Sequence, residues 1–311
     1  MRLIFLGTPA FAVPTLEGVA AAGHRVLMVV TQPDRPRGRG QNDAPPPVKQ
    51  AALRLGLPVY QPERVRRPEP VEYLRAVAVD AMVVVGYGQI IPQSIIDMAP
   101  LGIINVHGSL LPKYRGAGPI QWAILNGETR TGVTTMRIDA GLDTGDMLLK
   151  AETAIGPDET AVELGGRLAT IGAGLLVETL AGIEQRRIVP EKQDNALATY
   201  APLLKKEDGR IDWTRDARAL HNQVRGLQPW PGAATVFRGQ ALHIWRSRVW
   251  SGSSAGAPGS FASLKPLVVN CGTGALELME VQMEGRKRIP AADFANGQRL
   301  AENEYLGDAP A

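Results

Sequence analysis

The chain has 311 residues, of which 44% are hydrophobic and 21% are charged, with a formal net charge of +3 at pH 7. These values are near those of globular proteins and exclude bulk disorder, while the length favours two domains over one. Cys271 is the only cysteine, so an internal disulfide is excluded. The slight excess of positive charge permits a nucleic-acid partner without indicating one.

Membrane and metal-binding classes receive no support from the sequence. No charged segment followed by an apolar core opens the chain, and no uninterrupted apolar run approaches the roughly 18 residues of a membrane span, so we expect neither a secretory signal nor a membrane partner. The lone cysteine favours a reducing, cytoplasmic location. The four histidines, at positions 24, 107, 221 and 243, lack a second His or Cys at ligand spacing, and we expect no metal.

The first two-thirds of the chain alternates strand and helix patterns. Short apolar runs predict buried strands at Leu3–Leu6, Val26–Val30, Ala81–Val85 and Gly102–Val106. Helical patterns lie at Pro14–Ala22, Val48–Leu55, Pro70–Val77 and Pro119–Asn126. Further strands are expected at Thr131–Ile138 and Met147–Glu152, and a long helix at Glu159–Ala181. This alternation predicts βαβ units and an open, mostly parallel sheet.

The pattern changes in the last third. We predict a first domain at residues 1–189, a linker at 190–208 and a second domain at 209–311. After a helix at Ala217–Leu227, β-like runs are expected at Thr235–Phe237, Leu242–Trp245, Leu267–Asn270 and Leu276–Val281. Short strands separated by Gly/Ser-rich turns favour a small β-barrel.

The first strand does not lead into a dinucleotide-binding loop. Gly7 stands alone after it, and Gly86-Tyr87-Gly88 is not followed by a third glycine, so the G-x-G-x-x-G pattern is absent. A nicotinamide-dependent oxidoreductase is therefore disfavoured.

Polar residues follow the predicted strand at Gly102–Val106, where ligands of open sheets bind. Asn105 and His107 are two residues apart and point to the same side of an extended segment. An amide and an imidazole at one point suit an oxyanion site with an acid–base partner. Asp143, in an Asp/Gly-rich loop, can orient the histidine. Each of the three also has a simpler structural reading, as a cap, a buried histidine or a turn aspartate.

Residues 32–47 form a predicted long loop with three arginines and no apolar anchor. Long loops are usually functional or disordered, and arginine-rich segments commonly bind phosphate. A solvated loop is the alternative. Two further basic clusters lie at Lys205, Lys206, Arg210, Arg215 and Arg218, and at Arg286, Lys287 and Arg288.

Taken together, two segments carry a resemblance to a known family. INVHGSLLPKYRG at residues 104–116 and GLDTGDM at residues 141–147 resemble the signature of folate-dependent formyltransferases. TQPDRP at residues 31–36 and GRG at residues 38–40 narrow the resemblance to members whose acceptor is methionyl initiator tRNA. The similarity covers the whole chain. Gln41 and Asn42 stand where relatives often have lysines, and Gly118 replaces a more usual alanine.

The resemblance implies a Rossmann-like catalytic domain followed by an OB-like barrel, and 10-formyltetrahydrofolate as the formyl donor. It implies that Asn105, His107 and Asp143 are catalytic. It implies a folate site formed by Ser109, Leu110, Leu111 and Pro112, closed by the loop with Tyr87, Gly88 and Ile90, and tRNA contacts by Arg39, Lys205 and Lys206.

A direct transfer is the expected mechanism, because no Ser, Cys or Lys is visibly activated at this site. Asn105 and protonated His107 would donate to the tetrahedral oxyanion while Asp143 orients His107. Which group shuttles the proton stays open. Two alternatives remain, a formyltransferase acting on a nucleotide-linked amino sugar and a non-catalytic tRNA-binding protein. No coiled-coil heptad suggests assembly, so a monomer is expected.

Overall fold

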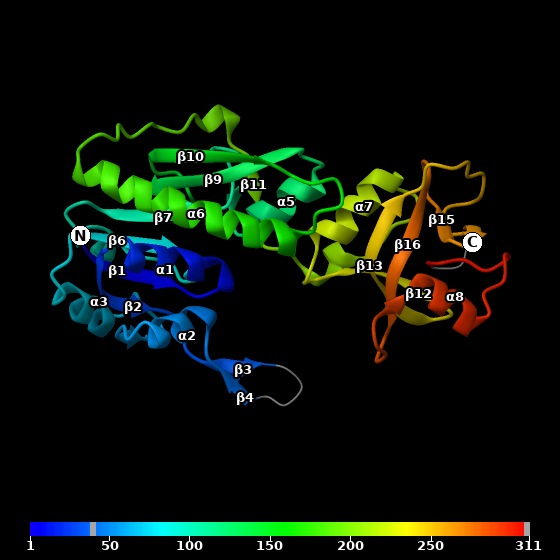
Figure 1. Cartoon of the computed structure of the whole chain (residues 1–311), viewed down its shortest axis with the longest axis horizontal. Helices are drawn as coiled ribbons and strands as arrows, with labels where there is room; N and C mark the ends of the chain where they lie inside the picture. Colours follow the sequence, from blue (N-terminus) through cyan, green and yellow to red (C-terminus); the bar gives the residue numbers. More distant parts are fainter. Residues whose placement is uncertain (38–41, 308–311) are drawn as a thin grey trace. The chain divides into compact units, whose positions relative to one another are not determined.

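The computed structural model describes residues 1–37 and 42–307, which form two compact units (Figure 1). The first unit comprises Met1–Pro119, Thr131–Thr153 and Gly165–Ala201. The second comprises Ile120–Arg130, Ala154–Leu164 and the residues from Pro202 onward. Two short segments that precede Pro202 in the sequence therefore belong to the second unit. The domain limits at residues 189 and 209 stay predictions.

The first unit is built on a seven-stranded, mostly parallel sheet. Its strands are β1 (Arg2–Gly7), β2 (Arg25–Val30), β5 (Val59–Tyr60), β6 (Ala81–Val85), β7 (Ile103–His107), β9 (Arg130–Arg137) and β10 (Met147–Ala154). They follow the order β10-β9-β7-β6-β1-β2-β5. From β7 to β5 neighbouring strands run parallel, and β9 is antiparallel to β7. The prediction of a Rossmann-like, mostly parallel sheet is confirmed.

Helices connect these strands. They are α1 (Val13–Ala21), α2 (Pro47–Arg54), α3 (Pro68–Arg75), the short α4 (Gln93–Ile96) and α6 (Ala161–Glu184), with the 3₁₀ turn η1 (Ala10–Ala12) before α1. A proline in the first two positions starts each of α1, α2 and α3. Proline suits these positions because its fixed φ is helical and the missing N–H would have no partner there.

The two faces of the sheet are covered by different helices. Ile4 and Leu6 of β1 pack in one buried cluster with Leu74 of α3 and Ile95 of α4. On the opposite face α6 approaches β7 at Gly172, where an added Cβ would lie 2.8 Å from Val106 Cγ1 and 3.3 Å from Val133 Cγ1. The absence of a side chain at Gly172 thus sets the distance between α6 and the strand that carries Asn105 and His107.

Helix α6 is long and apolar enough to cross a membrane by length and composition alone. Core helices of soluble proteins have the same features. Leu168, Leu176 and Leu180 of α6 are fully buried, as expected of a helix packed against a sheet.

Residues 32–47 were expected to form a loop without regular structure, and this is wrong for the described part. β3 (Arg35–Arg37) and β4 (Asn42–Ala44) form an antiparallel pair with Arg35 opposite Ala44. The base of this hairpin is held by Asp34, which accepts from Lys49 Nζ at 2.5 Å and from Gln61 Nε2 at 2.7 Å. Arg39 and Gln41 lie outside the described residues.

The second unit contains an antiparallel sheet, as predicted. Its strands are β12 (Ala233–Phe237), β13 (Gln240–Val249), β14 (Phe261–Leu264), β15 (Leu267–Asn270), β16 (Ala275–Met283) and β17 (Ile289–Pro290). The order is β12-β13-β16-β15-β14, with β17 also paired to β16. Closure into an OB-like barrel stays a prediction. The helices are α5 (Pro119–Leu125), whose first residue belongs to the first unit, α7 (Ala217–Gly226) and α8 (Ala291–Gln298).

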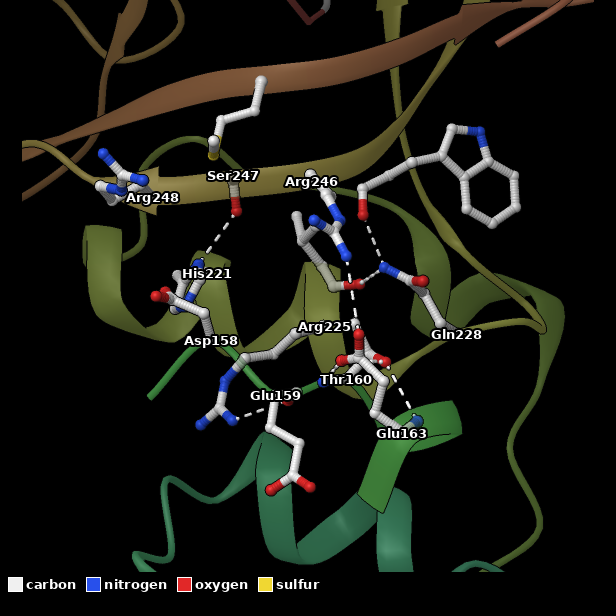
Figure 2. A pocket seen from close by; sticks show the side chains of 13 residues that line it. Asp158, Glu159, Thr160, Glu163, His221, Arg225, Gln228, Arg246, Ser247 and Arg248 are labelled. Carbon is white, nitrogen blue, oxygen red and sulfur yellow. Dashed lines mark hydrogen bonds and ion pairs between the residues drawn. The ribbon is translucent and has the colours of Figure 1, made fainter. Parts of the chain in front are cut away.

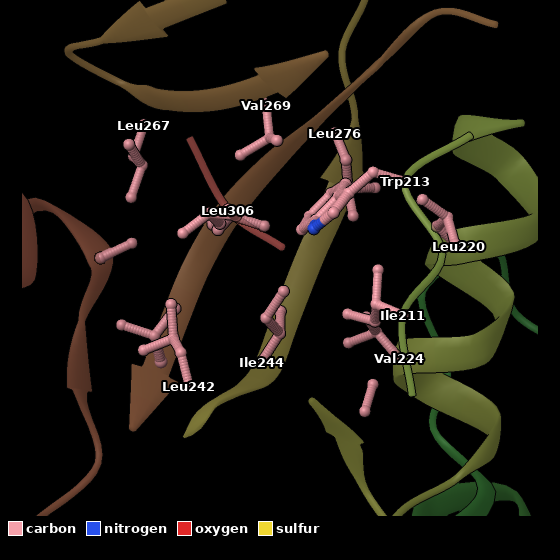
Figure 3. Packing of buried hydrophobic residues seen from close by; sticks show 14 of the residues in the cluster. Ile211, Trp213, Leu220, Val224, Leu242, Ile244, Leu267, Val269, Leu276 and Leu306 are labelled. Carbon is pink, nitrogen blue, oxygen red and sulfur yellow. The ribbon is translucent and has the colours of Figure 1, made fainter. Parts of the chain in front are cut away.

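Helix α7 packs on this sheet through a buried apolar cluster (Figure 3). Leu220 and Val224, one turn apart, meet Ile244 of β13 in this cluster. Trp213 joins the cluster and donates its indole N–H to Thr235 Oγ1 at 2.9 Å. The N-terminus of α7 is capped by Asp216, whose carboxylate accepts from two backbone N–H groups. The face of α7 turned to the sheet is thereby fixed.

Two glycine substitutions in α6 test the close approach to β7. Alanine is favoured over glycine inside a helix by about 1 kcal/mol. An added methyl at Gly174 meets nothing within 4 Å, so Gly174→Ala should raise the free energy of unfolding. Gly172→Ala must displace Val106 and Val133, and such overpacking costs about 1–3 kcal/mol. We expect it to lower the free energy of unfolding in urea titrations. Equal effects of the two substitutions would contradict the close packing.

Candidate active site

Asn105 and His107 lie at the carboxyl end of β7, inside the first unit. All five residues of β7 are buried because strands flank it on both sides and α6 packs above it. Only 8% of Asn105 and 5% of His107 remain exposed. Within residues 1–37 and 42–307, the Asn105 side chain has no hydrogen-bond partner. The Asn105 amide is not among the fully buried polar atoms that lack a partner, so it keeps some contact with solvent and is available to a ligand.

His107 is held between a carbonyl and a carboxylate. Its Nε2 lies 2.9 Å from Tyr114 O, and its Nδ1 lies 3.6 Å from Asp143 Oδ2. A carbonyl only accepts hydrogen bonds, so Nε2 carries a proton. Both ring nitrogens face acceptors, and only the imidazolium can donate to both.

Asp143 is positioned by backbone contacts. It has a left-handed φ of 52°, which an aspartate adopts more readily than most residues. Its Oδ2 accepts from Gly116 N at 2.9 Å. Gln193 Nε2 donates to the carbonyls of Asp143 and Gly145, both at 2.8 Å. These contacts fix the direction of the Asp143 carboxylate toward His107.

The segment Ser109–Pro112 forms a turn just after β7, which ends at His107, and this turn is hydrogen-bonded to the neighbouring strand β9. Ser109 Oγ donates to Lys113 O at 2.6 Å. The hydroxyl of Thr134, in β9, accepts from Leu111 N at 3.1 Å and donates to Ser109 O at 2.7 Å. Leu111 is buried against Met136 and Met147, and Leu110 and Pro112 are half-buried. The turn is therefore rigidly attached to the sheet.

The loop Tyr87–Ile90 presents its backbone and Ile90 rather than the Tyr87 ring. Tyr87 is 2% exposed, within the core cluster of the first unit, and burial raises the pKa of its hydroxyl. Its carbonyl accepts from Thr8 Oγ1 at 2.9 Å and Gln32 Nε2 at 3.2 Å. Gly88 and Ile90 are exposed.

A cavity of about 340 Å³ lies beside this loop. Asn105, His107 and Asp143 do not line this cavity. The residues that line it are Gln32, Arg35, Glu63, Arg64, Arg66, Gly88, Gln89 and Ile90. The structure thus brings together Asn105, His107, Asp143 and the Ser109–Pro112 turn, and places the Tyr87–Ile90 loop at a separate cavity of the same unit.

The predicted tRNA-binding lysines lie in the second unit. Lys205 and Lys206 are both exposed, at the start of the 3₁₀ turn η3 (Lys206–Gly209). Lys205 N donates to Asp208 Oδ2, which closes this turn.

Arg115 and Gln193 belong to the site and were not predicted. Arg115 is 2% exposed, and its guanidinium donates to Gln193 Oε1 and Asn195 Oδ1, both at 2.9 Å. In the described parts of the chain it has no carboxylate partner, so a positive charge is buried beside the Asp143 loop. The two-residue strands β8 (Arg115–Gly116) and β11 (Tyr200–Ala201) pair in parallel and hold this segment. The available signal was the position of Arg115 inside the INVHGSLLPKYRG motif.

A metal centre is not seen among the described residues, where no group of three or more His, Cys, Asp or Glu side chains could hold an ion.

Comparison with known proteins places both halves of the chain in one family. Residues 1–180 match the formyl transferase family and residues 203–299 match the formyl transferase C-terminal domain. A methionyl-tRNA formyltransferase of Solibacter usitatus is 75% identical over 308 residues, covering 99% of both chains. One from Koribacter versatilis is 56% identical over 310 residues, covering 99% of both.

Solved structures share the fold at lower identity. An N-formyltransferase from Helicobacter canadensis has a TM-score of 0.67 at 19% identity, covering 91% of this chain and 99% of that one. A methionyl-tRNA formyltransferase from Clostridium thermocellum has a TM-score of 0.56 at 18% identity, covering 81% and 95%. With full-length identity of 75% to one relative, the chain belongs to the methionyl-tRNA formyltransferase family.

Proposed function

We propose that this protein transfers the formyl group of 10-formyltetrahydrofolate to the free amino group of methionyl initiator tRNA. The observation that carries the proposal is the buried Asn105–His107–Asp143 constellation in a chain 75% identical to a methionyl-tRNA formyltransferase over its whole length. The intact constellation favours an enzyme over a non-catalytic tRNA-binding protein.

The transfer proceeds by direct attack of the amine on the formyl carbon. The new C–N bond forms as the carbonyl oxygen becomes an oxyanion, and the tetrahedral intermediate collapses by releasing the folate nitrogen. The unpartnered Asn105 amide supplies the hydrogen bond to that oxyanion. In a buried site, a pre-positioned donor of this kind needs no reorganisation as the charge develops.

His107 contributes to catalysis mainly through its positive charge, because neither of its ring N–H groups is free to donate to the oxyanion. Because Nε2 is occupied by Tyr114 O and Nδ1 faces Asp143, its imidazolium stabilises the neighbouring oxyanion mainly through its field. A direct hydrogen bond to the oxyanion requires that the ring exchange one of these two acceptors. Asp143 orients the ring and balances its charge.

The donor site is proposed to include the Ser109–Pro112 turn and the Tyr87–Ile90 loop. The Helicobacter canadensis structure is described as a complex with folinic acid, and one of HypX from Aquifex aeolicus as a complex with tetrahydrofolic acid. The rigid Ser109–Pro112 turn next to His107 suits one wall of a pterin site. Since its ring is buried, Tyr87 would act through its backbone, with Gly88 and Ile90 making the exposed contacts.

The tRNA is proposed to be held by Arg39, Lys205 and Lys206. The exposed lysines can neutralise backbone phosphates, and Arg39 lies outside the described residues. We also propose that the protein acts in the cytoplasm, as a monomer, consistent with its single cysteine and the absence of a heptad pattern in its sequence.

The acceptor is tested by following a labelled formyl group. Purified protein is incubated with formyl-labelled 10-formyltetrahydrofolate and, separately, Met-charged initiator tRNA, Met-charged elongator tRNA and a UDP-amino sugar. We expect label on the amino acid of initiator tRNA, detected after mild alkaline release. Label on the sugar alone would refute the tRNA assignment, and no label on any acceptor would favour the non-catalytic alternative.

Removal of the Asn105 amide tests the oxyanion site. Loss of one such donor typically lowers kcat about 10²–10³-fold. We expect Asn105→Ala to do so in single-turnover assays with little change in folding stability, because its amide makes no protein hydrogen bond. The control Asn296→Ala removes an exposed asparagine of α8. Wild-type kcat in Asn105→Ala would contradict the role.

Charge removal at Lys205 and Lys206 tests tRNA binding. The double substitution to alanine should raise KM for the charged tRNA and flatten its salt dependence, since two phosphate contacts are lost. kcat should stay near the wild-type value. Lys150→Ala, an exposed lysine of β10, is the matched control. An unchanged KM and salt slope would exclude these lysines from the interface.

A further inference from the structure

A second histidine faces a serine and an aspartate inside the second unit (Figure 2). His221 Nδ1, on α7, lies 3.1 Å from Ser247 Oγ on β13. Its Nε2 lies 3.1 Å from Pro157 O and 3.3 Å from Asp158 Oδ1. These side chains line a cavity of about 320 Å³, at the lower end of the size of small-molecule sites. The formyl-transfer chemistry proposed above uses none of them.

The contacts of His221 fix its tautomer. Pro157 O and the Asp158 carboxylate can only accept, so Nε2 carries the proton. Nδ1 is then a lone pair, and the Ser247 hydroxyl must donate to it. This is the order of groups around a nucleophilic serine, with a base on the hydroxyl and a carboxylate 3.3 Å from the far nitrogen of the base.

His221 is neutral at pH 7. Burial lowers the pKa of its imidazole, the hydrogen bond to Pro157 opposes this, and smaller effects come from Arg225 and Arg218, which lower the pKa, and Asp158, which raises it. The ring is therefore unprotonated at Nδ1 and has a lone pair there that can accept a proton. It is also rigid, because Arg225, one turn along α7, donates to the carbonyls of Gly156 and Glu159 in the same turn as Asp158.

The strand bearing Ser247 is irregular at this point. The register of β13 with β16 shifts on both sides of Arg246. Bulges of this kind re-aim side chains and are frequent near active sites. Ser247 points to His221, and the exposed Arg246 and Arg248 line the same cavity. Among residues 1–37 and 42–307, Arg248 has no carboxylate partner, whereas Arg246 lies 3.6 Å from Glu163.

We propose that Ser247 is a nucleophile activated by His221 and Asp158, in a hydrolytic site for small carboxylic esters that carry a negative charge. The cavity volume limits the ester to a small one. The free Arg248 guanidinium selects the negative charge and, with Arg246, supplies positive potential for the oxyanion. Val224, Trp245 and Met279 form the apolar part of the lining.

The reaction balances without a further reagent. Ser247 Oγ bonds to the ester carbonyl carbon while its proton passes to His221 Nδ1. The carbon–oxygen bond to the alcohol breaks, and that proton goes to the leaving oxygen, which gives an acyl-serine. Water then attacks the acyl carbon, loses its proton to Nδ1, and Ser247 recovers the proton as the carboxylic acid leaves.

A fluorophosphonate probe on the full-length wild-type protein provides the test. Peptide mass spectrometry should place the phosphonyl group on Ser247. A treated protein whose Ser247 stays unmodified overturns the proposal, whatever happens to any variant. Mono-p-nitrophenyl succinate should be hydrolysed faster than p-nitrophenyl acetate, and the reverse order would overturn the assigned substrate class.

Variants show whether Ser247 is labelled because His221 activates it or only because the probe can reach it. His221→Gln keeps a donor and an acceptor but cannot take a proton, and labelling should slow about 10²-fold or more. Asp158→Asn, at a side chain 67% exposed and thus tolerant of change, should slow it less. Ser263→Ala, a serine whose hydroxyl faces a backbone N–H, should label like the wild type. Labelling of His221→Gln at the wild-type rate overturns the proposal.

Ser247→Ala should retain formyl transfer, so a failure of this proposed site can be distinguished from a failure of the proposed function.

Discussion

The direction of the Asp143 carboxylate is the constraint on which the active site depends. A carboxylate can orient a buried imidazole only if the loop that carries the carboxylate is itself fixed. Two other segments of the chain fix the Asp143 loop. Gly116 N–H reaches the carboxylate itself, and Gln193 binds two carbonyls of the loop. Gly116 can do this because it has a φ of 119° and its Cα lies against Ala201 O, 2.7 Å from where a Cβ would stand. Any side chain at Gly116 would therefore move both the strand pair and the Asp143 contact.

Much of the fold could be predicted because strand and helix periodicity is strong in the first half. The four apolar runs correspond to β1, β2, β6 and β7, and the long helix to α6; β6 has the predicted limits, and no limit of the others is shifted by more than three residues. Short elements carry too few residues to show a period, so β5, α4 and β8 were not predicted. The β3–β4 hairpin was missed because its strands are short and mostly polar, and β3 contains a proline.

The three residues proposed to be catalytic could be named from spacing and resemblance, but the residues that position them could not. Residues 190–208 look like a linker because they lack periodicity. Their contribution includes isolated side-chain hydrogen bonds, in which Gln193 and Asn195 accept from Arg115 and Thr199 accepts from Tyr114 N. Polar side chains that act one at a time leave no pattern in a sequence. The buried Tyr87 ring is a related case, since a motif indicates that a loop is near a ligand but not which of its atoms are exposed.

The two buried histidines, His107 and His221, share one hydrogen-bonding contact and differ in the other. In both His107 and His221, a backbone carbonyl fixes the proton on Nε2. The difference lies at Nδ1, which faces a carboxylate in His107 and a hydroxyl in His221. A carboxylate can only accept, so His107 needs a second N–H on Nδ1 to donate to it, and the proposed role at an oxyanion uses that protonated form. A hydroxyl can donate, so it accepts a neutral ring, suited to removing a proton. In the two roles proposed here, the group opposite Nδ1 therefore distinguishes a histidine that acts as a charge from one that acts as a base.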